Sequence, residues 1–398
     1  MENASGLSRA FRFRLYPNRA QVEQIEATYR ACRWIWNRCL EIKDAAYKND
    51  GKSLNSTQLC KLITMYKRTG VGEWISVAPN SALQQSVRDL DAAYKNFFRR
   101  VKRGEAPGFP KYKRPSGAQS YRTPAGGRLD KSTGSYVGQC VAVIDERHVK
   151  LPKLGTVKCR ITQMPEGHIL SATVSRNPAG HYFVSLCCEN VPYPKVSDGS
   201  IDVMGVRVGV DDMMTCSDGV RVKGSKALSK SMKKLRREQR RLSRRKKGSA
   251  NWKKQKLKVA RVHERVHNQR QDAIHKATTR VVRDSRAVAV SSYSVKDMTR
   301  KVHGEGRSVQ RKRNRALLDA STFEVTRQLE YKCEWNRRAF IKVDSSSAFT
   351  RTCRVCGERH EGKIGKQWTC RRCGTTHDTA MNAARNIARA GSRELARI

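Results

Sequence analysis

The sequence predicts a mixed α/β protein of several domains, and three observations lead to this fold class. The chain has 398 residues, which is enough for two or three domains. Short strand-like runs gather between residues 140 and 188, and three apolar strands farther along are separated by long helical segments. A cluster of four cysteines precedes the last helical segment, which indicates a small metal-binding module in the second half.

The N-terminal region is predicted to begin with one strand and to continue as three helices. Residues 10–16 alternate apolar and basic side chains and stop at Pro17, which is typical of a strand. Apolar residues recur at helical spacing over 22–39, and a weaker helical pattern covers 55–66. A third helix is predicted to begin with Asn80 as its N-cap.

A β module is predicted from short strands joined by a hairpin turn at 177–180. Strands are expected at 140–144, 149–151, 157–161, 170–175 and 182–188. Because the strand at 10–16 can join them, the helices form an insertion. We therefore predict a β-barrel-like module made of 1–17 and 104–195, with a helical domain at 18–103 inserted in it.

The loop at 107–115 interleaves Phe109 and Tyr112 with prolines and basic residues. Such a stretch can stack on bases while it holds phosphates. An ordinary Pro-Gly loop has the same composition, so both interpretations stay open.

The second half predicts an α/β core of ribonuclease H type that follows a linker at 192–200. Strands are expected in the apolar run 203–214, after the turn at 217–219, at 286–290 and at 338–343. Helices are expected at 229–247, 250–282 and 316–336. Strands separated by helices in this order favour a layered core with a metal knuckle before its last helix.

The helix predicted at 229–247 is strongly basic, with little counter-charge of its own. Its cations are Lys233, Arg236, Arg237, Arg240, Arg241, Arg244 and Arg245. Their mutual repulsion requires an outside polyanion, so we predict that this helix binds RNA or DNA. A solvated helix face is the alternative.

The whole chain is basic, with 82 Lys and Arg against 35 Asp and Glu, for a formal net charge of +47. Nucleic acid is the polyanion that such a charge favours. No apolar run approaches the roughly 20 residues that span a bilayer, and the first residues lack a signal-peptide core. We expect a protein of the reducing cytoplasm with no membrane partner and no small-molecule substrate.

The four clustered cysteines are Cys353, Cys356, Cys370 and Cys373, arranged as two C-x-x-C pairs that each end on a glycine. This pattern is typical of a zinc ribbon in which four thiolates enclose a structural Zn2+ with no open position for chemistry. Two redox motifs or two disulfides are the alternatives.

Several short segments, taken together, are specific to one family. They include Phe13-Arg-Leu-Tyr-Pro17, Cys32-Arg-Trp-Ile-Trp-Asn37, Gly108-Phe-Pro-Lys-Tyr-Lys113 and Asn382-Ala-Ala-Arg-Asn-Ile387, with 83–90, 151–155, 241–246 and 268–270. In these segments the chain resembles, over nearly all its length, the TnpB family of transposon-encoded RNA-guided nucleases, which are relatives of type V CRISPR effectors.

The resemblance implies a guide RNA and a double-stranded DNA target, recognised after the protein reads a short adjacent motif. It also implies a wedge module, a helical recognition domain and a RuvC domain of ribonuclease H type. The RuvC domain would comprise 196–349 and 379–398, with a basic helical hairpin at 226–282 and a zinc ribbon at 350–378. In the family, three RuvC carboxylates hold two divalent cations that cut DNA.

This chain departs from the family at those three positions. Arg207, in Gly205-Val-Arg-Val-Gly209, stands at the first aspartate position, Ser291 at the glutamate position and Ala380 at the last aspartate position. A guanidinium repels a metal cation, so we expect no catalytic Mg2+ and no cleavage. Nuclease-dead members of the family, called TldR, occupy DNA and block transcription, so the resemblance implies a repressor in the bacterial nucleoid.

Two other functions stay open. One is an active endonuclease that uses displaced acids, for which Asp211, Asp212, Asp297 and Asp378 are the candidates, although their simplest interpretation is as solvated turn residues. The other is an unguided zinc-ribbon protein that binds nucleic acid.

The short DNA motif is expected to be read in the N-terminal modules, by side chains that can bond or pack against base edges. The candidates are Tyr47, Gln84, Gln85, Tyr121 and Thr123.

Overall fold

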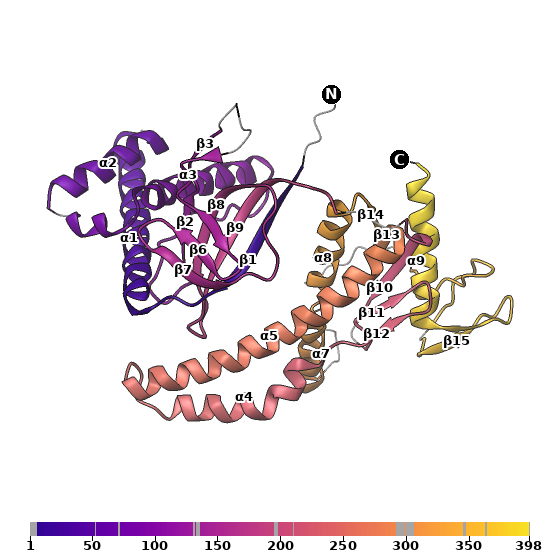
Figure 1. Ribbon diagram of the computed structural model, residues 1–398. Helices are drawn as coiled ribbons and strands as arrows, with labels where there is room; N and C mark the ends of the chain where they lie inside the picture. The colour runs from indigo at the N-terminus through magenta and orange to yellow at the C-terminus, as the bar shows by residue number, and fades with distance from the viewer. Residues whose placement is uncertain are drawn as a thin grey trace. The chain divides into compact units, whose positions relative to one another are not determined.

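The computed structural model describes residues 6–51, 53–70, 72–129, 132, 136–194, 198–209, 211–291, 299, 306–344, 348–362 and 364–397. The chain divides into two compact units, Met1–Pro192 and Tyr193–Ile398, which are considered separately below (Figure 1). The boundary falls where a linker was predicted. Asp297, one of the candidate displaced acids, lies outside the described residues.

The first unit is built on a seven-stranded sheet in the order β2-β8-β9-β1-β7-β6-β5. The strands are β1 (Leu7–Leu15), β2 (Gln119–Pro124), β5 (Ala142–Asp145), β6 (His148–Leu151), β7 (Gly155–Arg160), β8 (His168–Arg176) and β9 (Tyr182–Val191). Strand β1 pairs with β9 and β7, which lie far along the chain, so the helices between them form an insertion. Within the described residues, β2 and β5 are the outermost strands of this sheet.

Strand β2 is absent from the sequence-based prediction, as is the small hairpin of β3 (Arg128–Leu129) and β4 (Tyr136–Val137). The side chains of β2 alternate, with Tyr121 and Thr123 buried and Arg122 exposed. Few residues in β2 are strong strand formers, and its pairing with β8 determines its conformation.

The inserted helices are α1 (Arg19–Asp50), α2 (Ser56–Arg68) and α3 (Asn80–Lys102), with a short 3-10 helix η1 (Glu73–Val77) before α3. Asn18 and Asn55 begin α1 and α2 with capping boxes, in which each asparagine accepts a bond from the third backbone N–H and donates its own N–H in return. The prediction for Asn80 is wrong, because Pro79 is the N-cap and Asn80 is already helical.

The second unit contains a five-stranded sheet in the order β12-β11-β10-β13-β14. Its strands are β10 (Ile201–Val208), β11 (Met214–Cys216), β12 (Arg221–Val222), β13 (Ser285–Ser291) and β14 (Ala339–Val343). Strands β10, β13 and β14 are parallel, whereas β11 and β12 are antiparallel additions. The predicted run 203–214 is therefore two strands, not one.

The helices of this unit are α4 (Ala227–Ser243), α5 (Ala250–Asp284), α7 (Arg307–Ala320), α8 (Thr322–Trp335) and α9 (Thr379–Leu395). The prediction of one continuous helix at 316–336 is wrong, because this range contains the end of α7 and all of α8. Ser321 has φ 52°, in the left-handed region, and separates α7 from α8.

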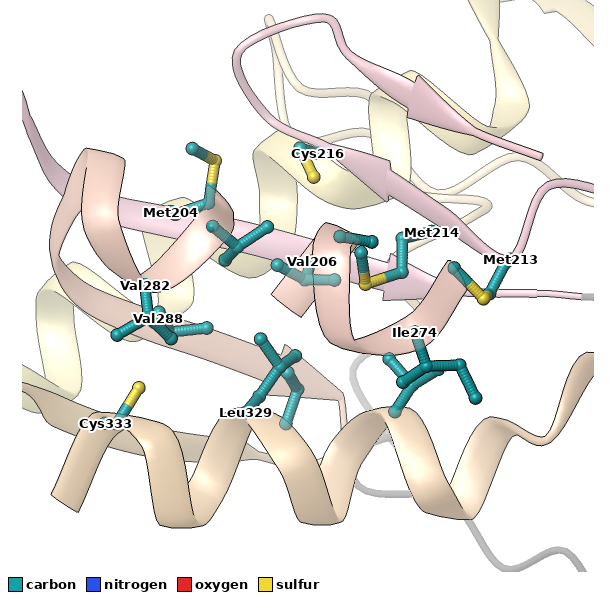
Figure 2. Packing of buried hydrophobic residues seen from close by; sticks show 14 residues of the cluster. Met204, Val206, Met213, Met214, Cys216, Ile274, Val282, Val288, Leu329 and Cys333 are labelled. Atoms are coloured by element: carbon teal, nitrogen blue, oxygen red, sulfur yellow. The ribbon is translucent and has the colours of Figure 1, made fainter. Parts of the chain in front are cut away.

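The sheet lies between two helical layers. Met204, Val288 and Val290 face α5 and α8, where Ile274 and Leu329 complete the core (Figure 2). The opposite face packs on α9 in a smaller core.

Strand β10 approaches α9 closely at Gly205, where a Cβ would lie 2.1 Å from the backbone oxygen of Ala384. No side chain fits there, and this contact determines how near α9 lies to the sheet. Within the described residues, no helix is long and apolar enough to cross a membrane.

Candidate functional site

A cavity of about 840 Å3 lies where β10 ends and α9 begins in the second unit. Arg207 and Ala380, two of the three positions singled out in the sequence, line it. Cations from four other segments also line it, and none of them was identified from the sequence: Arg221, Lys226, Lys312, Arg315 and Lys366. These residues are far apart in the chain, so only tertiary structure brings them together.

Ser291, the third position, lies beside Arg207 by strand register. Val206 pairs with Val290 in the parallel β10–β13 ladder, so the next residues on the two strands are Arg207 and Ser291. Side chains alternate along a strand, and both residues fall on the side of Gly205 and Ala289, which packs on α9. The three positions therefore occupy the same side of the sheet.

The acids of the cavity are held by arginine. Arg221 Nη2 lies 2.6 Å from Asp378 Oδ1, and Arg221 Nη1 lies 3.6 Å from Asp212 Oδ2. Asp378 also caps α9 by accepting a hydrogen bond from the backbone N–H of Met381 at 2.9 Å. The interpretation of Asp212 and Asp378 as solvated turn residues is wrong, because their side chains are only 16% and 30% exposed.

Arg207 is part of the same charge network. Burial lowers the pKa of its guanidinium, and the nearby Asp211, Asp212 and Asp378 oppose that shift. The guanidinium folds back over Gly209, where a Cβ would lie 2.8 Å from Arg207 Nη1. A positive group thus occupies the end of β10 among three carboxylates.

The acids of the cavity do not gather as metal ligands. In the part of the chain that the structure describes, the four cysteines are the one group of three or more His, Cys, Asp or Glu side chains positioned to share an ion. Asp211, Asp212 and Asp378 therefore do not form a displaced metal site in this conformation.

The four predicted cysteine ligands come together in the ribbon, with their sulfur atoms all within 4.8 Å of one another. The Cys353–Cys373 and Cys356–Cys370 sulfur pairs are each 3.6 Å apart. A tetrahedron with metal–sulfur bonds of about 2.3 Å has edges of about 3.8 Å, so the spacing fits a bound metal. It is far longer than a disulfide bond of about 2.05 Å, and all 13 cysteines are free.

Local structure of the ribbon follows from its glycines. Gly357 and Gly374 have φ 79° and 71°, and each donates its N–H to the carbonyl of the first cysteine of its knuckle. The second knuckle lies on the hairpin of β15 (Gln367–Thr369) and β16 (Thr376–Asp378), which runs directly into α9.

Two asparagines on α9 bind the ribbon to this helix. Asn382 and Asn386 lie one helical turn apart and both donate to the carbonyls of Phe349 and Thr352. Asn382 also accepts from the backbone N–H of Arg354 at 3.2 Å. The Asn-Ala-Ala-Arg-Asn segment thus links the first knuckle to the helix that begins at the cavity.

The basic hairpin consists of α4 packed on α5. Buried Gln255 donates to the carboxylate of buried Glu238 at 2.8 Å, and Leu235 lies on the same inner face. The seven predicted cations are accessible, and six of them (Lys233, Arg236, Arg237, Arg240, Arg241 and Arg244) line a depression of about 410 Å3. Of these, Arg237 and Arg241 also contact Glu238.

The candidates for reading DNA do not form one surface. Tyr121 is 5% exposed and packs on Tyr29, and Thr123 is fully buried and bonded to Ser81. A buried side chain cannot reach a base edge, so these two residues are not available for motif reading in this conformation.

The other three candidates remain accessible. Tyr47 is 67% exposed, and Gln84 and Gln85 are partly exposed on α3. Gln85 Nε2 donates to Asp89 at 2.8 Å, and Asp89 also pairs with Arg122. Gln84, Gln85 and Tyr47 therefore stay predictions.

Family models match three parts of the chain. They are OrfB_IS605, "Probable transposase", at 185–302, "Cas12f1-like, TNB domain" at 323–387 and a "Helix-turn-helix domain" at 5–52. The described part of the last range contains strand β1 and one continuous helix, α1.

Curated relatives match almost the whole chain. "Putative RNA-guided DNA endonuclease InsQ" of Escherichia coli (strain K12) is 31% identical over 395 residues, which cover 97% of this chain and 93% of the relative. "Putative RNA-guided DNA endonuclease" of Streptomyces pristinaespiralis is 31% identical over 393 residues, with 97% and 90% covered.

Solved structures show the same fold at low identity. The "Cas12f1-sgRNA-target DNA complex" has a TM-score of 0.50 at 14% identity, covering 92% of this chain and 82% of that one. The "mini-RNA-guided endonuclease CRISPR-Cas_phi3" has a TM-score of 0.52 at 10% identity, covering 97% and 92%. These likenesses concern the fold alone, and they agree with the mixed α/β class predicted from the sequence.

Fold and ribbon together define a mixed α/β protein with four clustered cysteines whose spacing fits a metal. The curated relatives are 31% identical to this chain over almost its whole length, which identifies its family. The chain belongs to the TnpB family.

Proposed function

We propose that this protein is an RNA-guided DNA-binding protein that does not cut DNA and that represses transcription by occupying its target. The names of its relatives support a guide RNA and a DNA target as partners. The bacterial cytoplasm, in association with the nucleoid, is the location that this function requires.

The observation that carries the proposal is the chemistry of the cavity beside α9. A two-metal site needs several anionic oxygens to hold two divalent cations close together. Here the three family positions carry Arg207, Ser291 and Ala380, and two remaining acids are paired with Arg221. A guanidinium at the end of β10 supplies the charge that a cation would otherwise bring.

The other partners follow from the charged and cysteine-rich modules. The accessible cations of α4 support binding of the guide RNA through its phosphates. The sulfur geometry of the ribbon supports Zn2+, which prefers four thiolates in a closed tetrahedral site. Such a metal would be structural and would hold the ribbon against α9.

An active endonuclease is the second candidate, because the relatives are named for that activity. It would require Asp211, Asp212 or Asp378 to leave its present position and bind metal. The ion pairs of Arg221 oppose that rearrangement.

The test uses the protein purified together with its RNA. That RNA is sequenced first, and a plasmid is then prepared that carries the complement of the guide segment. We expect footprinting to show protection of the complementary site and no strand breaks with Mg2+ or Mn2+. Cutting at the site would identify an endonuclease instead. Protection that ignores the guide sequence would identify an unguided nucleic-acid binder.

Repression is tested separately in cells. A reporter promoter that overlaps the complementary site should lose expression when the protein and its RNA are present. A scrambled guide is the matched control. Full expression despite protection of the site in vitro would contradict repression while leaving guided binding in place.

A further inference from the structure

The end of α3 and the loop that follows it carry an exposed aromatic surface in the first unit. Phe98, Phe109 and Tyr112 are 54%, 46% and 56% exposed, and we call these three residues the aromatic surface. Large apolar side chains grouped in the open mark an interaction site more often than isolated ones do.

The aromatic surface rests on a packed cluster of rings. Phe97 meets Phe98 and Phe109 edge to face, with ring centroids 5.0 and 5.3 Å apart. Phe109 also meets Tyr94 at 5.6 Å. Tyr94 is buried, and this burial raises the pKa of its phenol, with smaller contributions from the charges of Asp44 and Tyr112. The inner rings thus hold the outer ones in place.

The loop is fastened to α1 although it has no regular secondary structure. Trp36 Nε1 donates to the carbonyl of Lys111 at 3.1 Å. Asn37 accepts from the backbone N–H of Lys113 at 2.8 Å and donates to its carbonyl at 3.0 Å. Lys113 Nζ lies 3.8 Å from the centre of the Trp36 ring. A loop held in this way presents its side chains at fixed positions, as binding loops do.

Cations without acidic partners surround the aromatic surface. In the described part of the chain, no ion pair involves Arg99, Arg100 or Lys111, all of which are exposed. The guanidinium of Arg100 lies against Gly108, where a Cβ would be 2.7 Å from Nη1 and φ is +64°. Because Gly108 has no side chain, the guanidinium of Arg100 can lie close to the loop. Aromatic faces beside uncompensated cations match the bases and phosphates of an unpaired nucleic-acid strand.

We propose that the aromatic surface binds an unpaired segment of the guide RNA. Bases stack on Phe98, Phe109 and Tyr112, while Arg99, Arg100 and Lys111 contact the phosphates. The inference rests on the proposed RNA partner. RNA is favoured over target DNA because an aromatic surface exposed in the free protein needs a partner that stays bound. The charge of the surroundings favours RNA over a second protein, because phosphates along one strand can pair with all three of these cations.

The test measures binding of the full-length protein, freed of co-purified RNA, to a single-stranded oligoadenylate RNA and to the same RNA annealed to its complement. Phe98→Ala with Tyr112→Ala should weaken binding of the single strand about tenfold. The slope of log K against log salt should not change, because stacking releases no counterions. Binding of the duplex should not change either, since its bases are already paired.

Two further variants make the result specific. Arg99→Ala with Lys111→Ala should lower the salt slope for the single strand by about 0.7 for each phosphate interaction that the substitutions remove. Phe323→Ala, at a side chain that is 68% exposed in the second unit, is the control and should have no effect.

The outcomes separate this inference from the proposed function. If Arg236→Ala with Arg240→Ala weakens RNA binding but the aromatic variants do not, the aromatic surface is not an RNA site and the RNA partner stands. If the unaltered protein binds RNA but no variant weakens binding, the aromatic surface is again not an RNA site. If the unaltered protein does not bind RNA at all, the RNA partner itself is wrong. A loss confined to single-stranded DNA of the same sequence, or a change in oligomeric state alone, would overturn the commitment to RNA.

Discussion

Arg221 joins the edge of the second sheet to the start of α9, because its Nη2 lies 2.6 Å from Oδ1 of Asp378. The same oxygen accepts the backbone N–H of Met381, so Asp378 serves as both ion-pair partner and helix cap. Both interactions hold the Oδ1 atom of Asp378 in place at the start of α9.

The first prediction concerns the pH dependence of this ion pair. Burial is the largest single influence and opposes ionisation of Asp378, but the hydrogen bond and charge of Arg221, together with the backbone N–H groups of Met381 and Ala380, outweigh it and lower the pKa below the ordinary 3.8. A folded-state pKa below the unfolded one stabilises the protein above about pH 4, and the stabilisation is lost as pH falls through the folded value. Asp378→Asn, which keeps the cap, should cost about 0.2–1 kcal/mol at pH 7.

Urea unfolding of wild type and Asp378→Asn at a series of pH values tests this prediction. The difference in unfolding free energy should be constant near neutrality and shrink as the solution becomes acidic. A difference that does not depend on pH would mean that the carboxylate charge contributes nothing.

The second prediction is that cleavage can be restored only by rebuilding all three carboxylates. Arg207→Asp, Ser291→Glu and Ala380→Asp together return the charge that two cations require. Guide-dependent cutting in Mg2+ should appear in the triple variant and not in Arg207→Asp alone, since one carboxylate cannot hold two cations. Gel analysis of plasmid nicking measures both. Cutting by the unaltered protein would refute nuclease loss.

The third prediction concerns the ribbon. Elemental analysis should find one zinc per chain, and Cys370→Ser should release it, because serine does not replace a thiolate ligand. Cys187→Ser, at a cysteine outside the ribbon, should retain the metal and serves as the control.

Loss of zinc should also loosen α9, since Asn382 and Asn386 fasten the helix to the first knuckle. Hydrogen exchange of α9 amides should accelerate in Cys370→Ser. Unchanged exchange would show that the ribbon does not support this helix.

The fourth prediction concerns α4. Replacing Arg236, Arg237, Arg240 and Arg241 by Ala should weaken RNA binding and lower the salt slope by about 0.7–0.9 for each phosphate that is no longer neutralised. Arg236 and Arg240 should account for most of the change, because Arg237 and Arg241 already contact Glu238. Filter binding over a range of salt concentrations gives the slope. An unchanged slope would indicate a helix face that meets only solvent.

The fifth prediction concerns the DNA motif. Gln84→Ala and Gln85→Ala should weaken binding of a matched target by about 1–3 kcal/mol for each bidentate base interaction that they remove, with RNA binding unchanged. The loss should be larger at Gln84, because Gln85 is bonded to Asp89 in the free protein. Competition between targets with different adjacent motifs measures the preference. If the preference survives both substitutions, other residues of the first unit read the motif.

Local signals predicted most of the fold. The helical spacing in α1, the alternation in β1 and the glycines of the ribbon each follow from interactions within a few residues. Elements that depend on distant partners were missed or misplaced. Strand β2 exists because β8 pairs with it, and the break at Ser321 leaves no clear mark on the helical pattern.

The candidate site shows the same division. The cysteines and Arg207 could be recognised from their spacing and their neighbours. Arg221 could not, because its importance comes from an antiparallel addition to the sheet that brings it to Asp378. Burial of Tyr121 and Thr123 likewise depends on how β2 faces the helices, which residue type alone does not reveal.

The close approach of Gly205 to α9 determines the position of the helix on the sheet, whereas the reactivity of the site depends on other side chains. Position 205 admits no side chain, because a Cβ would strike the backbone of α9, and this contact does not involve the side chains at positions 207, 291 and 380. Substitutions of the cavity side chains that abolish a reaction can therefore accumulate without moving the helix or the strands. The chain remains recognisable to any comparison based on its overall sequence or shape, so kinship by itself carries no information on whether such a protein is still an enzyme.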